Sequence, residues 1–347
     1  MPERPADYVV DAANRNLAAE GVCFEFPNIE KIDILVTFRC NAACAHCITR
    51  SHPKRTEWLE EREVLDLLAV GAEQGKRYTS FTGGEPFLDF PRLLRCVRFA
   101  KQKGYFVCAD SNAFWGVTDR RATDWVQRLV DAGLNALFPS ADHFHLPFVS
   151  LDRVRRVVEA CDRVGLPCEV NFAPGPDPTE NERIIGALDL RSRGYFCDGL
   201  ELTGNDVSGF LHLYPQLSPA EMDDIGSMHM GVGAGGDVYA NVDISDDGAW
   251  FHGTPLLLGN IRREDLTSLF VAERERPILA LTRTRGPREV DGWLRAHAEI
   301  GPGYAARFAD RRYYSPTAYW FDLFHAPEAA RYISALEAWN TSSASVK

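Results

Sequence analysis

A regular alternation of short apolar runs and helical segments limits most strongly how this 347-residue chain can fold. Candidate strands lie at 32–38, 77–81, 105–109, 135–139, 167–172 and 199–202. From the second strand on they begin at 77, 105, 135, 167 and 199, about one every 30 residues. This length fits one strand, one helix and two connections, so the strands should run parallel and be joined by right-handed crossovers.

The segments between the strands have the spacing of helices with one apolar face. The clearest covers 151–164, with Ser150 as a candidate N-cap and Gly165 as a stop. A second covers 90–100, between Asp89 and Gly104. Six strand–helix units are fewer than the eight of a complete barrel, so we expect an α/β fold: a partial (β/α)6 TIM-like barrel. A flat, doubly wound sheet has the same period and is the alternative.

The pattern changes after about residue 205. Residues 231–236 are glycine-rich and predict a loop, while 237–242 and 256–261 predict strands and 264–272 a helix. Many aromatic residues follow between 288 and 340. We therefore divide the chain into a lead-in segment (1–30), a barrel (31–210), a smaller C-terminal α+β extension (211–340) and a tail (341–347).

Composition excludes several classes of protein. The net charge of -11 disfavours a nucleic-acid partner, because binding to phosphates relies on positive charge. The polar N-terminus does not resemble a signal peptide, and there is no run of 18 apolar residues, so we expect a cytoplasmic protein without membrane contact. Nine cysteines are an odd number, which favours metal ligands and buried thiols over a disulfide framework.

Three of these cysteines, Cys40, Cys44 and Cys47, follow the first strand within eight residues. Three thiolates can hold three corners of a [4Fe–4S] cluster and leave the fourth iron open for chemistry. A structural zinc site is an alternative, with Cys23, His46 or His52 as the fourth ligand. Three ordinary buried thiols are another.

A second motif, Gly83-Gly84-Glu85-Pro86, ends the second strand, 36 residues after Cys47 (83 − 47). Glycines let the backbone approach a ligand closely, and backbone groups at a strand end can bind an amino-acid moiety. Alone this motif would be an ordinary turn. Its position one strand–helix unit after the cysteines indicates a shared site.

The two motifs together resemble those of the radical S-adenosylmethionine (SAM) superfamily, over roughly residues 32–205. The resemblance implies that Cys40, Cys44 and Cys47 hold one [4Fe–4S] cluster, whose open iron binds the amino and carboxylate groups of SAM. It also implies that Gly83, Gly84, Glu85 and Pro86 contact the cofactor, and that His46 stands where the family usually has an aromatic residue beside the adenine. The resemblance also predicts cofactor contacts from polar residues at the ends of later strands, at Ser111, Asn112, Ser140 and Asn171.

Further polar residues follow the fourth and sixth strands, on the side where barrel folds carry their active sites. Asp142, His143 and His145 could bind a polar substrate or transfer protons, and Glu201 closes the sixth strand. We predict a catalytic role for these four. Each could instead cap a helix or form a turn.

The C-terminal region is similar to the SPASM-type extension of this superfamily, which normally holds auxiliary clusters through cysteines. No cysteine follows Cys197, so we expect no auxiliary cluster. Without that electron acceptor, a redox-neutral outcome is favoured: epimerisation, rearrangement, elimination, radical addition or decarboxylation.

The resemblance implies an enzyme that takes one electron from a flavodoxin- or ferredoxin-type reductant. It would cleave SAM to methionine and a 5′-deoxyadenosyl radical, which abstracts a hydrogen atom from the substrate. We expect a small polar metabolite, of sugar or nucleoside type, in a specialised natural-product pathway. A ribosomally made peptide is the alternative, although the short segment before the first strand leaves no room for an added peptide-recognition domain. A non-catalytic cluster-binding protein is the alternative from another class.

Overall fold

The structure is a computed structural model that describes residues 27–193, 195–197, 216–222, 228–241 and 251–344. Its centre is a curved sheet with the strand order β4-β3-β2-β1-β7-β8-β9. Four neighbouring strands run parallel: β1 (Lys31–Thr37), β2 (Tyr78–Gly83), β3 (Phe106–Ser111) and β4 (Ala136–Pro139). They match the first four predicted strands within one or two residues at most ends.

Two further parallel strands, β5 (Val170–Phe172) and β6 (Tyr195–Cys197), form a separate pair. Isolated parallel bridges from Leu137 to Cys168 and from Ser140 to Asn171 join β5 to β4. The resulting series of six parallel strands confirms the partial barrel. The sixth strand lies a few residues before the predicted 199–202, which are outside the described residues.

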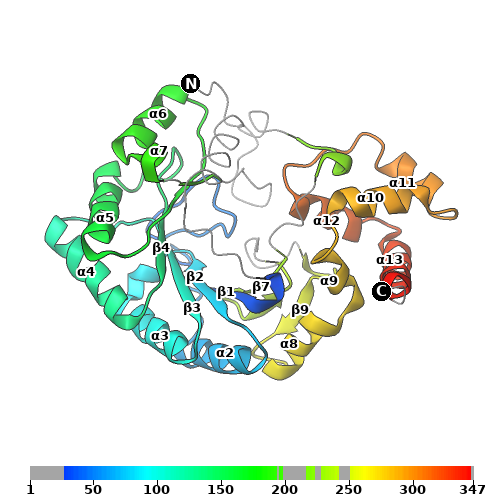
Figure 1. Ribbon diagram of the computed structural model, residues 1–347, viewed down its shortest axis with the longest axis horizontal. Helices are drawn as coiled ribbons and strands as arrows, with labels where there is room; N and C mark the ends of the chain where they lie inside the picture. The colour runs from blue at the N-terminus through cyan, green and yellow to red at the C-terminus, as the bar shows by residue number, and fades with distance from the viewer. Residues whose placement is uncertain (1–26, 194, 198–215, 223–227, 242–250, 345–347) are drawn as a thin grey trace.

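Helices cover the outer side of the arc formed by these strands (Figure 1). Asp89 caps α3, because its carboxylate accepts the N–H of Arg92 at 3.2 Å. Ser150 precedes α5 as predicted, although its hydroxyl makes no capping bond, and Gly165 ends the helix in a left-handed conformation, with φ of 79°. The helices of this part are α2 (Glu61–Glu73), α3 (Phe90–Gln102), α4 (Asp119–Ala132), α5 (Leu151–Val164), α6 (Pro178–Ala187) and α7 (Leu190–Arg193).

Three strands of the C-terminal region extend the same sheet beyond β1. β7 (Met230–Val232) pairs parallel to β1, and the hairpin of β8 (Asp237–Tyr239) and β9 (Leu257–Asn260) continues it antiparallel. The prediction of a loop over 231–236 was therefore wrong at its start. Met230 and Val232 are fully buried in the core, and this burial, together with pairing to β1, outweighs the low strand propensity of glycine.

The rest of the described chain is helical. Residues 288–340, expected to belong to an α+β region, contain helices, connecting loops and one isolated bridge from Tyr313 to Leu217, and the strands of the extension lie before them. The helices are α8 (Leu266–Glu275), α9 (Pro277–Thr282), α10 (Pro287–Ala296), α11 (Gly301–Arg307), α12 (Pro316–Phe324) and α13 (Ala329–Ala344). Short 3-10 turns are η1 (Asn28–Glu30), η2 (Pro86–Asp89) and η4 (Pro219–Glu221).

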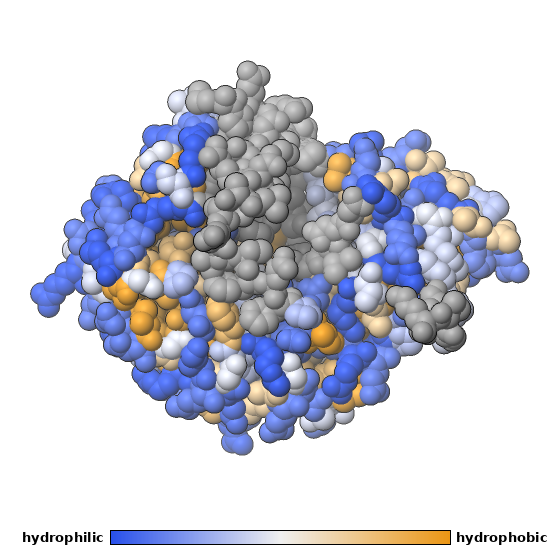
Figure 2. All heavy atoms as spheres, viewed as in Figure 1, coloured by the Kyte–Doolittle hydropathy of each residue, from blue (hydrophilic) through white to orange (hydrophobic). Residues whose placement is uncertain are grey.

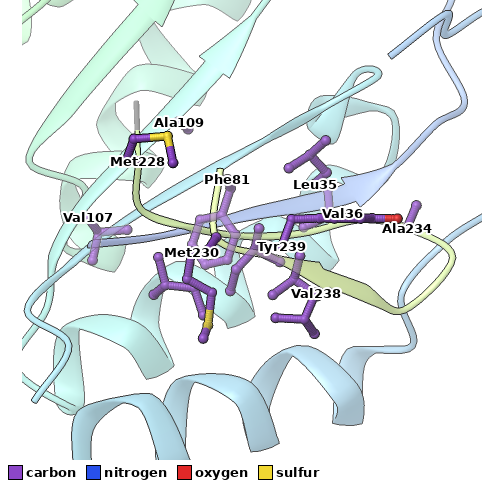
Figure 3. Packing of buried hydrophobic residues seen from close by; sticks show 14 of the residues in the cluster. Leu35, Val36, Phe81, Val107, Ala109, Met228, Met230, Ala234, Val238 and Tyr239 are labelled. Atoms are coloured by element: carbon purple, nitrogen blue, oxygen red, sulfur yellow. The ribbon is translucent and has the colours of Figure 1, made fainter. Parts of the chain in front are cut away.

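One continuous apolar core joins the barrel strands to the C-terminal hairpin. Phe81, Met230 and Val238 are buried in this cluster and come from β2, β7 and β8 (Figure 3). Hydrophilic residues dominate the described part of the face seen in Figure 2, with smaller apolar areas between them. Burial of apolar area from both parts therefore stabilises them together.

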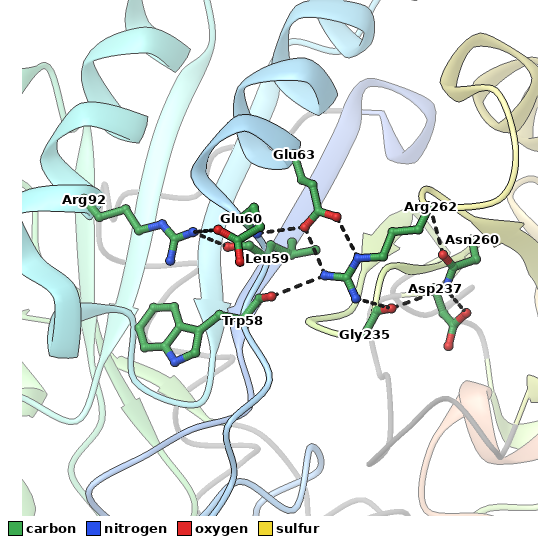
Figure 4. A network of polar contacts seen from close by, with 9 residues as sticks. All are labelled: Trp58, Leu59, Glu60, Glu63, Arg92, Gly235, Asp237, Asn260 and Arg262. Atoms are coloured by element: carbon green, nitrogen blue, oxygen red, sulfur yellow. Dashed lines mark hydrogen bonds and ion pairs between the residues drawn. The ribbon is translucent and has the colours of Figure 1, made fainter.

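Polar contacts strengthen the same junction. The guanidinium of Arg262, just after β9, donates to both carboxylate oxygens of Glu63 on α2 at 2.6 and 3.0 Å and to the carbonyl of Gly235 at 3.1 Å (Figure 4). Lys76 and Glu273 form a second link, an ion pair of 2.6 Å whose two side chains are 2% and 1% exposed. Among the described helices, none is both long and apolar enough to cross a membrane.

Candidate active site

The loop that follows β1 brings the three motif cysteines into one small apolar cluster. Cys40 and Cys44 are buried, Cys47 is half-buried, and none of the three forms a disulfide. Phe144 and Ala173, from the connections after β4 and β5, pack against them. The loop and the ends of distant strands thus meet at the carboxyl edge of the sheet.

Donor groups in this loop point toward sulfur. The backbone N–H of Ala42 lies 3.4 Å from Sγ of Cys40, and the N–H of Ser51 lies 3.3 Å from Sγ of Cys47. The hydroxyl of Thr49 is also 3.3 Å from Sγ of Cys47. Hydrogen bonds of this kind stabilise thiolates, which are the form that binds iron.

The two glycines of the Gly-Gly-Glu-Pro motif are required by the start of the cysteine loop. Gly83 has φ of +114°, and a Cβ there would lie 2.5 Å from the carbonyl oxygen of Thr37. At Gly84 a Cβ would lie 2.2 Å from the carbonyl oxygen of Arg39, so no side chain fits. The motif therefore packs directly against the backbone that leads to the cysteines.

Glu85 is fully buried and connects this motif to the end of β3. Its carboxylate accepts the hydroxyl of Ser111 at 3.0 Å and the backbone N–H of Asn112 at 2.7 Å. It also accepts the N–H of Phe87, after the buried Pro86 that begins η2. Burial raises the pKa of Glu85 to about 7, although these hydrogen bonds oppose the rise.

Ser111 and Asn112, both predicted to contact the cofactor, differ from each other in their contacts within the protein. The Ser111 hydroxyl donates to Glu85 and accepts from the N–H groups of Ala113 and Trp115, so protein groups use all its hydrogen bonds. The amide nitrogen of Asn112 donates to Oδ1 of Asn41 at 2.9 Å and lies 3.6 Å from Sγ of Cys40. Asn112 therefore holds the cysteine loop, and Ser111 positions Glu85.

His46, Asp142 and His145 form a second group beside the cysteines. The carboxylate of Asp142 accepts Nδ1 of His145 at 2.9 Å and lies 3.7 Å from Nε2 of His46. The ring of His46 stacks on Phe144 with centroids 4.6 Å apart, and its Nδ1 is buried without a hydrogen-bond partner among the described residues. Asp142 thus connects two imidazole rings from different parts of the chain.

Charge coupling decides the protonation of this group. Burial alone would raise the pKa of Asp142, but His145 and His46 outweigh it and lower the value to about 2. For His145, burial acts to lower the pKa, yet Asp142 and a hydrogen bond with Cys44 raise it well above its usual value. Burial lowers the pKa of His46 to about 4. The side chain of His145 thus contacts both the carboxylate of Asp142 and the motif residue Cys44.

His143 does not join this group, although it stands between Asp142 and His145 in sequence. Its Nδ1 contacts a carboxylate oxygen of Glu180 on α6 at 2.5 Å. Both residues line an open groove of about 440 Å³ together with Leu146, Pro147 and Arg183. The structure thus separates two histidines that we predicted to share a catalytic role.

Ser140 and Asn171 lie opposite each other where β4 and β5 end. Ser140 donates its backbone N–H to the carbonyl of Ser111 at 2.8 Å, which continues the sheet pairing. The side-chain amide of Asn171 donates to Oδ1 of Asp110 at 3.1 Å. Both residues stand at the expected edge. Glu201, the remaining predicted catalytic residue, lies outside the described residues.

Three polar residues on the inner face of the sheet were missed by the sequence reading: Asp33, Asp110 and His229. His229 Nε2 lies 2.9 Å from a carboxylate oxygen of Asp33, and Asp110 accepts the hydroxyl of Ser80 at 2.8 Å. An acid within an otherwise apolar strand was a usable signal for Asp33 and Asp110. No local signal marked His229, because only pairing of β7 with β1 brings it to Asp33.

The residues around the cysteine loop fit a cluster bound by three thiolates. The cysteines at positions 96, 108 and 161 lie in α3, β3 and α5, Cys168 precedes β5, Cys197 ends β6, and Cys23 lies outside the described residues. Of the two histidines proposed as zinc ligands, His52 uses Nδ1 to accept the N–H of Lys54, and the ring of His46 stacks on Phe144. Three clustered thiols, two of which have amide donors aimed at sulfur, therefore match an iron–sulfur site with one open metal position.

Comparison with known proteins agrees with this geometry. Residues 34–187, which include both motifs, match the model of the radical SAM superfamily. The chain is 30% identical over 129 residues to the putative peptide biosynthesis protein YydG of Bacillus subtilis, covering 37% of this chain and 40% of that protein. It is 35% identical over 142 residues to the GTP 3′,8-cyclase of Chlorobaculum tepidum, covering 39% and 41%.

Among solved structures, anSMEcpe with bound AdoMet and a Cp18Cys peptide aligns over 89% of this chain and 99% of that one, with a TM-score of 0.44 and 13% identity. The chain spans about two-fifths of the length of the two relatives named above. The family match ends at residue 187, so the SPASM-type nature of 211–340 stays a prediction. Residues 34–187 are a radical SAM domain.

Proposed function

We propose that this protein reductively cleaves SAM at a [4Fe–4S] cluster held by Cys40, Cys44 and Cys47. The single observation that carries the proposal is the convergence of these three thiols with the Gly-Gly-Glu-Pro segment at one sheet edge. When bound and reduced by an external donor, such a cluster would supply the one electron needed to cleave SAM to methionine and a 5′-deoxyadenosyl radical, which would abstract a hydrogen atom from the substrate.

The residues of this chain arrange and shield that chemistry. Glu85 fixes the Gly-Gly-Glu-Pro segment, and Asn112 holds the cysteine loop against the end of β3. Phe144 and Ala173 keep the surroundings of the thiols apolar. An apolar site from which water is excluded limits the side reactions of a radical. His46, stacked on Phe144, presents a planar ring suited to the adenine.

The substrate we propose is a small polar metabolite of sugar or nucleoside type, changed without net oxidation. The half-buried polar side chains on the inner face of the sheet support a polar substrate. The similarity to a cyclase that acts on GTP, as its name states, is in keeping with it. We further propose a flavodoxin- or ferredoxin-type reductant and a cytoplasmic location, because an exposed iron–sulfur cluster needs a reducing compartment.

A peptide substrate is the second candidate, favoured by the similarity to a putative peptide biosynthesis protein. The two candidates differ in what stimulates formation of 5′-deoxyadenosine. A sugar or nucleoside that raises its yield supports the first, and stimulation only by peptides supports the second.

The proposal is tested by anaerobic reconstitution with iron and sulfide, followed by addition of dithionite and SAM. We expect about four irons per chain, the number in one cubane, and formation of 5′-deoxyadenosine. Cys44→Ala should abolish both cluster absorbance and cleavage. Cys96→Ala, at a buried cysteine of α3, is the matched control and should retain both. Zinc in the oxygen-free wild-type protein, or a complete cluster that never yields 5′-deoxyadenosine, would contradict the proposal.

A further inference from the structure

Several polar side chains on the inner face of the half-barrel are only partly buried. Along β1 and β5, side chains toward the helices are buried, whereas Asp33 and Asn171 on the other face are half-buried. The same holds for Thr82 on β2 and Asp110 on β3. In a complete barrel this face is filled by packed branched apolar side chains. Here it carries polar side chains that are partly exposed.

Asp33 and His229 form a pair on this face. β7 pairs with β1 so that Gly231 lies opposite Asp33, which places His229 on the same side of the sheet. Nε2 of His229 lies 2.9 Å from Oδ2 of Asp33. The other ring nitrogen, Nδ1, is buried and has no hydrogen-bond partner among the described residues, while the whole side chain is 9% exposed. A buried nitrogen without a partner is costly, and a bound ligand would satisfy it.

Asp110 adds a second carboxylate whose described partners are all neutral. It accepts the hydroxyl of Ser80 at 2.8 Å and the amide of Asn171 at 3.1 Å, and no described lysine or arginine forms an ion pair with it. Two lysines lie near this face in the described chain: Nζ of Lys31, at the first residue of β1, lies over the ring of Tyr78, and Lys76, paired with Glu273, interacts electrostatically with Asp33. The inner face is therefore acidic and rich in hydrogen-bond acceptors.

This acidic face lies close to the site of the cofactor. Asp110 stands two residues before Asn112, which contacts the cysteine loop. A molecule bound at Asp110 would thus lie near the carboxyl end of β3, where a radical formed from SAM could reach it. The remaining pair, Asp33 on β1 and His229 just before the neighbouring strand β7, lies deeper along the same face.

We propose that Asp33, Asp110 and His229 form the substrate-binding site of the barrel, and that this site takes a molecule rich in hydrogen-bond donors, either hydroxyls or an ammonium group. Asp33 orients the ring of His229, whose Nδ1 contacts one polar group of the substrate, and Asp110 accepts from another. The inference rests on the proposed function and names the part of the substrate that the protein recognises.

The test uses the full chain with its cluster reconstituted and SAM bound. Saturation-transfer difference NMR measures weak binding of three matched probes: glucose, with hydroxyls only; glucosamine, which adds an ammonium; and glucuronate, which adds a carboxylate. We expect glucose and glucosamine to bind and glucuronate to be excluded by the two carboxylates. Stronger binding of glucosamine identifies an ammonium as the recognised group, and equal binding identifies the hydroxyls.

Substitutions at Asp110 and His229 test whether the probes bind at this inner face. Asp110→Asn and His229→Gln should each weaken probe binding by about tenfold, the effect of losing one hydrogen bond to a charged or well-oriented group. Asp131→Asn, at an exposed residue of α4, is the control and should bind as the wild type does. Bound iron and the unfolding temperature of each variant show that it has folded, and Asp33→Asn provides a third variant if one fails.

Three results would overturn the inference: binding of glucuronate as strong as that of glucosamine, no binding of any probe, or unchanged binding in folded Asp110 and His229 variants. Formation of 5′-deoxyadenosine by the wild type is measured separately. Probe binding without cleavage would refute the proposed function alone, and cleavage without probe binding would refute the substrate site alone.

Discussion

The carboxylate of Glu85 accepts the backbone N–H of Asn112 at 2.7 Å and thereby joins the Gly-Gly-Glu-Pro segment to the end of β3. Glu85→Gln would place an amide NH₂ where these donors need an acceptor. We expect the free energy of unfolding of the cluster-free protein to fall by about 1–3 kcal/mol, measured by urea denaturation. Less iron should also be retained after reconstitution. Glu328→Gln, at an exposed position, should change neither quantity.

His145 should influence the reduction potential of the cluster. Its ring is held by Asp142 and forms a hydrogen bond with Cys44. Hydrogen bonds to cluster thiolates stabilise the reduced, more negatively charged state, so His145→Gln should make the midpoint potential more negative. A redox titration followed by electron paramagnetic resonance measures this. His143→Gln is the matched control, because that ring faces Glu180, and an equal shift in both variants would contradict the prediction.

The ionised carboxylate of Asp110 should lower the free energy of unfolding at neutral pH. Burial raises its pKa from 3.8 to about 6, so between these values the folded state binds more protons than the unfolded state. The free energy of unfolding therefore falls as the pH rises through this window, and the cost is fully present above pH 6. Asp110→Asn should be more stable than the wild type at pH 7.5 by roughly 1–3 kcal/mol and nearly equal to it at pH 4.

Urea unfolding at several pH values measures this difference. The other titratable groups facing Asp110 are Asp33, Tyr78 and Cys108. Burial raises the pKa of both Tyr78 and Cys108, which keeps them neutral throughout this range. The pKa of Glu85 is raised as well, so Glu85 also makes the free energy of unfolding fall with rising pH, in the wild type and the variant alike. Subtracting the two curves of free energy against pH therefore isolates the contribution of Asp110. A variant that is less stable than the wild type at pH 7.5 would show that the carboxylate serves folding instead.

Removing one partner of the Lys76–Glu273 ion pair should lower the free energy of unfolding more than removing both. Glu273→Ala leaves a buried lysine unpaired, and we expect a loss of about 3–5 kcal/mol in the free energy of unfolding. The double change Lys76→Met with Glu273→Leu removes both charges, so most of that loss should be recovered. Thermal and urea unfolding of the single and double variants measure this coupling, and additive losses would contradict it.

Local pattern in the sequence was sufficient for the parallel strands and the cysteine loop. Strands of the barrel are continuous apolar runs, and the helix over 151–164 repeats its apolar residues on one face, so both are encoded within short windows. The three cysteines lie within eight residues, which makes their meeting a local property. The loop over 231–236 was predicted wrongly because glycine argues against a strand until β1 offers a pairing partner.

The chemistry of the polar residues was decided by tertiary structure. Asp142, His143 and His145 are neighbours in sequence, yet His143 turns to Glu180 while the other two face the cysteines. Asp33 and His229 are 196 residues apart and meet only because β7 pairs with β1. The sequence by itself determined which elements form and which thiols gather. The long-range pairing of strands determined which side chains share the inner face, because their contacts depend on register and burial that no short window contains.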